Sequence, residues 1–257
     1  MIINKKCDQG GENHMLAYKF VSTMMDHIEL ITREESESIN KAAEWIADSI
    51  AKDGLLHLFG CGHSHLLVED FFYRAGGMVP VNAILETSIM LHEGAVKSSK
   101  VERMSGYAEH ILDNYIVHPG EVIIVISNSG INSLPVEMAM AAKAKGLRVV
   151  ALCSSAYSGD ETRHHSGHRL RDIADLVIDN HMPHGDALVE LPSSGVKMAS
   201  GSTAIGSIIL NMVMTSVAEK LIDRGIEPPI YVSGNISGGF EHNQAYIDRY
   251  RSRIKHL

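Results

Sequence analysis

Five short apolar runs, each followed by a polar loop or turn, constrain the fold of this chain most strongly. The clearest run, residues 122–126, reads Val-Ile-Ile-Val-Ile, with no polar residue between the apolar ones. A strand without such alternation is typical of a parallel sheet that helices cover on both faces. The other expected strands are 55–59, 78–85, 149–153 and 176–179. The sequence therefore predicts an α/β protein, a three-layer α/β/α sandwich around a five-stranded parallel sheet.

Helical patterns lie between these runs and extend beyond them at both ends. Apolar residues recur with helical spacing over 15–52, as one long helix or two in tandem, and residues 202–223 form a long apolar helix. We expect one domain over 15–257, with an N-terminal helical extension and a C-terminal tail. Residues 1–14 are interpreted as an N-terminal arm. The apolar surface of the two long helices exceeds what one sheet face needs, so either a dimer interface or buried core can explain it.

Composition excludes several classes of partner. The chain has 257 residues and a formal net charge of -8, which argues against nucleic acid and against a polybasic membrane anchor. The strand-like runs are too short to span a bilayer. No secretory signal is visible, and Cys7, Cys61 and Cys153 lack the spacing of a paired or zinc-binding set. We therefore expect a reduced, cytoplasmic setting.

Three polar loops are candidates for ligand binding. The first, residues 60–65, contains Gly62 and Ser64, where glycine permits close backbone approach and a following helix offers free N–H groups. A dinucleotide fingerprint would need a third glycine where His65 stands, so we expect no NAD and no other cofactor.

The second and third loops complete the set. The second follows residues 122–126 and contains Ser127, Asn128, Ser129, Gly130 and Asn132. Its hydroxyls and N–H groups suit an anion without any lysine, although a helix cap would explain one of these residues. The third loop starts the long apolar helix with Ser202 and Thr203. Loops that follow parallel strands lie at one sheet edge, where α/β proteins bind ligands.

Taken together, these loops resemble the SIS (sugar isomerase) domain over about residues 35–225. That family has a glycine-serine loop, a later Ser-x-Ser-Gly-x-Thr loop and a Ser-Thr helix start. Asn132 stands where threonine is usual, which leaves Ser133 as a possible replacement hydroxyl. Segments 165–170, 185–187 and 238–243 also resemble an uncharacterised bacterial branch of stand-alone SIS proteins. The resemblance implies a homodimer and a phosphosugar ligand contacted by Ser64, Ser127, Ser129 and Ser202.

An aldose–ketose isomerase needs a base and an acid near that ligand. Glu86, just beyond the second expected strand, is the leading base, and Glu93 is the alternative. The acid is expected to be a histidine, because the pKa of an imidazole allows both protonation states at cellular pH. His63 lies in the first loop, while His242 can reach a site only by folding over it, in its own chain or a neighbour's.

Metal binding is the rival use for 15 histidines. His164 and His168 have i, i+4 spacing, and His181 and His184 lie near Asp186. The glutamate of an HExxH motif is absent, so we expect no metal. The leading hypothesis is a phosphosugar-binding protein, an aldose–ketose sugar-phosphate isomerase. The alternatives are a phosphosugar lyase or etherase, and a non-catalytic sensor or assembly module.

Overall fold

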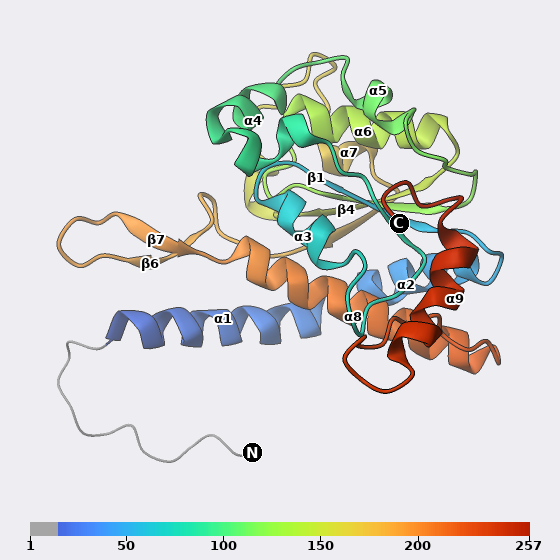
Figure 1. Ribbon diagram of the computed structural model, residues 1–257. Coiled ribbons are helices and arrows are strands. Elements are labelled where there is room, and N and C mark those ends of the chain that lie inside the picture. The colour runs from blue at the N-terminus through green and yellow to red at the C-terminus, as the bar shows by residue number, and fades with distance from the viewer. Residues whose placement is uncertain (1–14) are drawn as a thin grey trace, which may run out of the picture.

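Five parallel strands form the centre of the protein. The computed structural model describes residues 15–257 and orders the strands β2-β1-β3-β4-β5 (Figure 1). Their bounds are β1 Leu56–Gly60, β2 Val81–Ala83, β3 Val122–Ile126, β4 Arg148–Cys153 and β5 Leu176–Asp179. The predicted five-stranded parallel sheet is confirmed. The strand order reverses between β1 and β3, which places the topological switch point, and thus the expected ligand edge, at their carboxyl ends.

Helices cover both faces of the sheet (Figure 1). One face packs against α2 (Ser36–Ile50), α3 (Ser64–Asp70) and α8 (Ser202–Asp223). The other packs against α5 (Ala108–Leu112), α6 (Ser133–Ala144) and α7 (Leu170–Ile173), with α4 (Ala95–Val101) on the same side. In β3, Ile124 belongs to the first core and Ile123 to the second, and every residue of the strand is buried. The unbroken apolar run is therefore explained by two cores that share one strand.

The long N-terminal pattern forms two helices rather than one. α1 (Met15–Glu34) and α2 are separated at Glu35, whose side chain turns inward at the end of β5. Its carboxylate accepts a hydrogen bond from the Asp179 N–H at 3.1 Å and contacts the His181 ring at 3.0 Å. These partners compensate the burial of a charged group where the helix breaks.

Several elements differ from the expectation. β2 is shorter than the predicted 78–85, because Met78 pairs antiparallel with Ile230 instead of continuing the strand. The hairpin of β6 (Ala187–Glu190) and β7 (Lys197–Ser200) was not predicted, and α9 (Gly239–Tyr250) makes the C-terminal tail largely helical. Short 3₁₀ turns are η2 (Thr87–Ile89), η3 (Leu91–Glu93) and η4 (Ser155–Tyr157). The expected arm, 1–14, lies outside the described residues.

α8 is long and apolar enough, by length and composition, to cross a membrane. In this fold it is a partly buried core helix. Ile205, Ile209 and Val213 are fully buried at its contact with the sheet and its neighbouring helices. Its apolar character is explained by that packing.

A buried polar network lies at the amino end of the sheet. Glu121 directly precedes β3, and its Oε1 accepts hydrogen bonds from the Leu55 N–H at 2.9 Å and from Arg253 at 2.6 Å. Its Oε2 lies 2.9 Å from His57 Nε2 and accepts the His118 N–H at 2.7 Å. Burial alone would raise the pKa of Glu121, but the bonds from His57, Arg253 and the His118 N–H lower it to about 2.

We expect Glu121→Gln to lower the free energy of unfolding at pH 7 by roughly 3 kcal/mol, which is the fall of this pKa from 4.5 to about 2 expressed as free energy. Because the folded-state pKa is depressed, the stabilisation is present above about pH 4.5 and is lost as the pH falls toward about 2. Urea unfolding of both proteins between pH 7 and pH 3 measures the difference. The exposed Glu109→Gln is the control, and equal stability losses in the two variants would contradict the assignment.

Candidate functional site

Segments far apart in the sequence meet in one pocket at the carboxyl edge of the sheet. Four predicted residues line it: Ser64, Asn128, Ser202 and Thr203. Asn180 and a set of apolar or small residues complete the lining: Leu67, Ile126, Leu152 and Gly206. The cavity volume is about 10 Å³, room for about one water molecule. A larger ligand therefore requires the loops and α8 to move apart.

The first loop joins β1 to α3. Gly62 has φ +56°, a left-handed conformation that favours glycine, and its N–H donates to the Ile89 carbonyl at 3.0 Å. His63 is exposed at the start of α3. The hydrogen bond between Gly62 and Ile89 holds the first loop against η2, the turn that follows Glu86.

His65, which lies in the first loop with His63 and follows Ser64, is a buried histidine. It is 2% exposed, its Nδ1 lies 3.0 Å from Glu69 Oε1, and its Nε2 has no hydrogen-bond partner among residues 15–257. Burial, more than any other effect, lowers the pKa of His65, against the opposing influence of Glu69. The i, i+4 spacing of His65 and Glu69 was the signal in the sequence that could have identified this pair.

The second loop is held in shape by its own groups. Ser127 is buried, and its hydroxyl accepts the Gly130 N–H at 3.2 Å. Gly130 has φ +64°, and a Cβ there would lie 3.3 Å from Leu170 Cβ, so this position requires glycine. Ser129 is half-buried. The loop therefore presents Asn128 to the pocket, while Ser127 maintains the turn.

Asn132 does not line the pocket. Its amide nitrogen donates to Glu102 at 2.8 Å, and its oxygen accepts from Arg163. Ser133, the possible replacement hydroxyl, is buried and donates to the Arg163 carbonyl at 3.2 Å. Both side chains are engaged in holding the neighbouring loop against α6.

A carboxylate occupies the amino terminus of α8. Asp186 accepts hydrogen bonds from the Ser202 hydroxyl at 2.6 Å, the Ser202 N–H at 2.8 Å and the Gly201 N–H at 3.3 Å. Helix N-termini favour negative charge, so Asp186 takes the place that a bound phosphate would use. Sequence reasoning missed this contact, since Asp186 lies 16 residues before Ser202.

Asn180 is a second pocket residue that was missed. It directly follows β5, it is buried, and its amide nitrogen donates to Asn128 Oδ1 at 2.9 Å. Its own oxygen accepts the Met182 N–H at 3.0 Å. A polar residue immediately after the fifth strand was the available signal, by the same reasoning that selected Ser127 after the third.

The two candidate bases are in different environments. Glu86 is half-buried, and its Oε1 accepts the Ser88 N–H at 3.2 Å. Partial burial tends to raise the pKa of Glu86, but the hydrogen bonds from Ser88 and Tyr107 and the charge of Lys255 outweigh it and lower this pKa. Glu93 is exposed and lies 3.8 Å from Lys97. Glu86 is therefore ionised at neutral pH and held in position, whereas Glu93 is a surface group.

His242 lies at the opposite end of the sheet from the pocket. Its Nε2 donates to the Ile230 carbonyl at 3.0 Å, and Ile230 bridges to Met78, which precedes β2. The expectation that His242 folds over the site of its own chain is therefore not met. His256 lies 2.9 Å from the Tyr115 hydroxyl, which also bonds the backbone of Leu85, the residue before Glu86.

Three of the four histidines considered for metal binding each lie beside a different carboxylate. His164 lies 3.3 Å from Glu137, His181 lies 3.0 Å from Glu35, and His184 lies 2.9 Å from Asp160. Residues 160–169 are irregular, so His164 and His168 lack the helical register that their spacing suggested.

The two described cysteines are not suited to nucleophilic chemistry. Cys61 and Cys153 are free and buried. Burial raises the pKa of both thiols, that of Cys153 to about 12. Neither thiol is ionised at neutral pH, and the thiolate is the nucleophile.

The fold and this edge site define a parallel α/β protein with a small polar cavity at the switch point. The chain belongs to the SIS domain family, whose profile matches residues 19–154. It is 44% identical to a UPF0309 protein of Geobacillus kaustophilus, over 92% of this chain and 94% of that protein. It is 45% identical to a UPF0309 protein of Halalkalibacterium halodurans, over 88% and 91%. The resemblance to the SIS domain and to a bacterial branch of it is confirmed.

Two solved structures show a similar fold. A phosphoheptose isomerase of Neisseria gonorrhoeae is 15% identical, with a TM-score of 0.53 over 81% of this chain and 100% of that chain. A phosphoheptose isomerase of Francisella tularensis is 14% identical, with a TM-score of 0.52 over 84% and 100%. At this identity the likeness shows the fold alone.

Proposed function

We propose that this protein binds a sugar phosphate at the carboxyl edge and interconverts its aldose and ketose forms. The observation that carries the proposal is the convergence of Ser64, Asn128, Ser202 and Thr203 in one pocket. Membership of the SIS domain family supports the class of ligand, and the two similar isomerase folds support the class of reaction.

Hydroxyls, amides and helix N-termini would hold the phosphate. The residues that line the pocket include no lysine or arginine, so neutral donors and the N-termini of α3 and α8 supply the attraction. Asp186 must release Ser202 before a phosphate can use the α8 donors, because two anions in one site repel each other.

Glu86 is the proposed base. As a carboxylate it can take a proton from the carbon beside the sugar carbonyl and return it to the neighbouring carbon, which moves the carbonyl without net oxidation. The turn after Glu86 is bonded to the first loop through Gly62 and Ile89. The acid that helps to open the ring is His63 of the same chain, or His242 contributed by a second copy.

Replacement of Ser64 tests ligand binding. Removal of one hydroxyl bonded to a charged phosphate is expected to weaken binding roughly 10- to 100-fold, since such a bond contributes about 1.5–3 kcal/mol. Calorimetric titration with a panel of aldose and ketose phosphates measures the effect in Ser64→Ala. The control is Ser105→Ala, on the surface and outside the pocket. If no sugar phosphate binds the unaltered protein, the proposal fails.

Replacement of Glu86 tests the reaction. Glu86→Gln keeps the size of the side chain but cannot accept the proton, so turnover of a bound sugar phosphate is expected to fall at least about 100-fold while its affinity stays within a few-fold. Product analysis by NMR follows the interconversion. Glu93→Gln is the matched control, because Glu93 lies nearby on the surface. Undiminished turnover in Glu86→Gln would exclude Glu86 as the base.

A non-catalytic sensor or assembly module is the second candidate. The distance of His242 from the pocket favours it, since that histidine cannot complete the site of its own chain. Ligand binding without turnover of any sugar phosphate would select this alternative. A lyase or etherase uses the same proton abstraction, and a released leaving group among the products would distinguish it from an isomerase.

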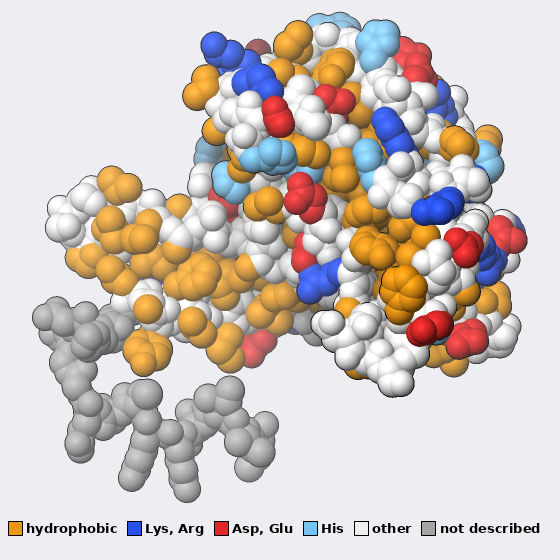
Figure 2. Space-filling view, in the orientation of Figure 1, with side chains coloured by type: hydrophobic (Ala, Val, Ile, Leu, Met, Phe, Trp, Pro, Cys, Tyr) orange, Lys and Arg blue, Asp and Glu red, His pale blue; other side chains and the backbone are white. Residues whose placement is uncertain are grey.

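We also propose that the protein is a homodimer that pairs through a projecting arm. α1 and the β6–β7 hairpin extend together beyond the body of the molecule (Figure 1), and apolar side chains gather on this arm (Figure 2). On α1, Tyr18, Val21 and Met25 lie on one face at helical spacing, and Tyr18 is 68% exposed. On the hairpin, Val196 and Met198 are 60% and 52% exposed. Such a surface is typical of subunit contacts.

A charge placed on the arm tests this contact. Val21→Asp puts a carboxylate where a second copy would pack, so we expect the dimer to dissociate at micromolar concentration. Light scattering coupled to size exclusion measures the mass. Val96→Asp is the control, because Val96 on α4 is 72% exposed but lies away from the arm. A monomeric unaltered protein, or a dimer that survives Val21→Asp, contradicts the proposal.

A further inference from the structure

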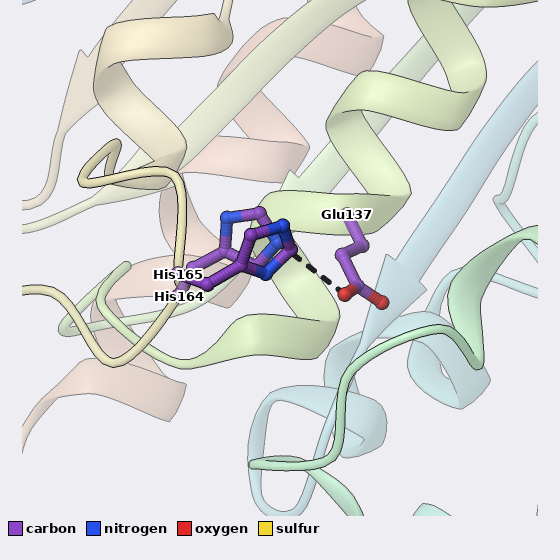
Figure 3. Close-up of side chains that lie close together, drawn as sticks. All are labelled: Glu137, His164 and His165. Atoms are coloured by element: carbon purple, nitrogen blue, oxygen red, sulfur yellow. Dashed lines mark ion pairs between the residues drawn. The ribbon is translucent and has the colours of Figure 1, made fainter.

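One glutamate and two adjacent histidines converge outside the pocket. Glu137 lies on α6, and His164 and His165 lie in the loop between β4 and α7 (Figure 3). A carboxylate oxygen and one ring nitrogen from each histidine all lie within 4.8 Å of one another. We propose that these three side chains bind one divalent transition-metal ion, of the kind that Zn²⁺ represents.

The distances suit a shared ion. His164 Nε2 and Glu137 Oε1 are 3.3 Å apart. Two ligand atoms on one tetrahedral Zn²⁺, each about 2.0–2.1 Å from the ion, are separated by about 3.3 Å. His165 is exposed, and its ring centroid lies 4.2 Å from that of His164. It can therefore rotate toward the ion without disturbing the core.

Neighbouring groups fix the first two ligands in place. The His164 ring is buried, and its Nδ1 lies 2.7 Å from the Ser166 hydroxyl, which leaves Nε2 directed at Glu137. Both Glu137 oxygens accept the Gly106 N–H, at 2.9 and 2.8 Å. Metal-binding histidines commonly have their second ring nitrogen held in this way.

An ion pair alone would account for Glu137 and His164. It does not explain why a ring nitrogen of His165 also lies within 4.8 Å of both of the other ligand atoms. Two imidazoles and one carboxylate are a ligand set that Zn²⁺ accepts, with the fourth position left for water. Glu137 also lines a surface groove of about 300 Å³ with Gly106 and Met140, which gives an ion access from solvent.

The ion would stabilise the second polar loop from the far side of the sheet. The Arg163 N–H donates to the Ile131 carbonyl at 2.8 Å, and the Leu170 N–H donates to the Gly130 carbonyl at 2.8 Å. The segment that carries His164 and His165 is thus bonded to the loop that presents Asn128. α6 packs on the face opposite α3 and α8, so we assign the ion a structural role rather than a place among the reacting groups.

Titration of the full chain with Zn²⁺ tests the site. Competition with a chromophoric chelator is expected to show that the unaltered chain binds Zn²⁺. In His165→Ala the Zn²⁺ affinity should be at least about tenfold weaker. This variant alters only an exposed side chain, so folding is not at risk. Replacement by Co²⁺ gives a second readout, because tetrahedral Co²⁺ absorbs visible light and that absorption should also be lost in His165→Ala.

The control is His168→Ala, which removes an exposed histidine of the same loop that does not belong to the cluster. Zn²⁺ affinity and Co²⁺ absorption should match those of the unaltered protein. The proposal is overturned if the unaltered chain binds no Zn²⁺, if His165→Ala binds it equally well, or if His168→Ala weakens it as much. None of these outcomes depends on whether a sugar phosphate binds.

Discussion

The exclusion of water from both faces of the parallel sheet is the constraint on which the rest of the structure depends. All residues of β1 and β3 are buried, so two separate cores must form, one on each side. A parallel sheet also requires every connection to return to the same end, and the carboxyl ends of the strands therefore meet at one edge. Ser64, Asn128 and Asn180 lie in one pocket for this reason, although they are far apart in the chain.

Much of the fold could be predicted because its signals are local. The bounds of β3, β5 and α8 follow from apolar runs and periodicity alone. A break in the N-terminal helical pattern was one of two alternatives, but its position at Glu35 could not be predicted, since the residues that Glu35 contacts, Asp179 and His181, lie more than 140 residues away. The start of β2 could not be predicted either, because Met78 pairs with the distant Ile230 instead of joining the strand. The β6–β7 hairpin was missed because its short strands are mostly exposed or half-buried and carry little apolar pattern.

The candidate site shows the same division between local and long-range information. Sequence spacing indicated which loops would meet, because sheet topology determines that. It did not indicate how side chains would be engaged: Asn132 is held by Glu102 and Arg163, and Ser202 is held by Asp186. The position of His242 could not be predicted, since the path of the tail after α8 depends on packing that no local pattern encodes.

Asp186 connects two parts of the molecule that have been described separately. It bonds the first residues of α8, and it directly precedes β6, the first strand of the hairpin beside α1. An anion that displaces its carboxylate from Ser202 breaks three hydrogen bonds at the stem of that hairpin. If loss of these bonds shifts the hairpin, occupancy of the pocket and the position of the arm are thermodynamically linked: whatever stabilises one position of the arm alters affinity at the sheet edge, and the reverse holds by the same free energy.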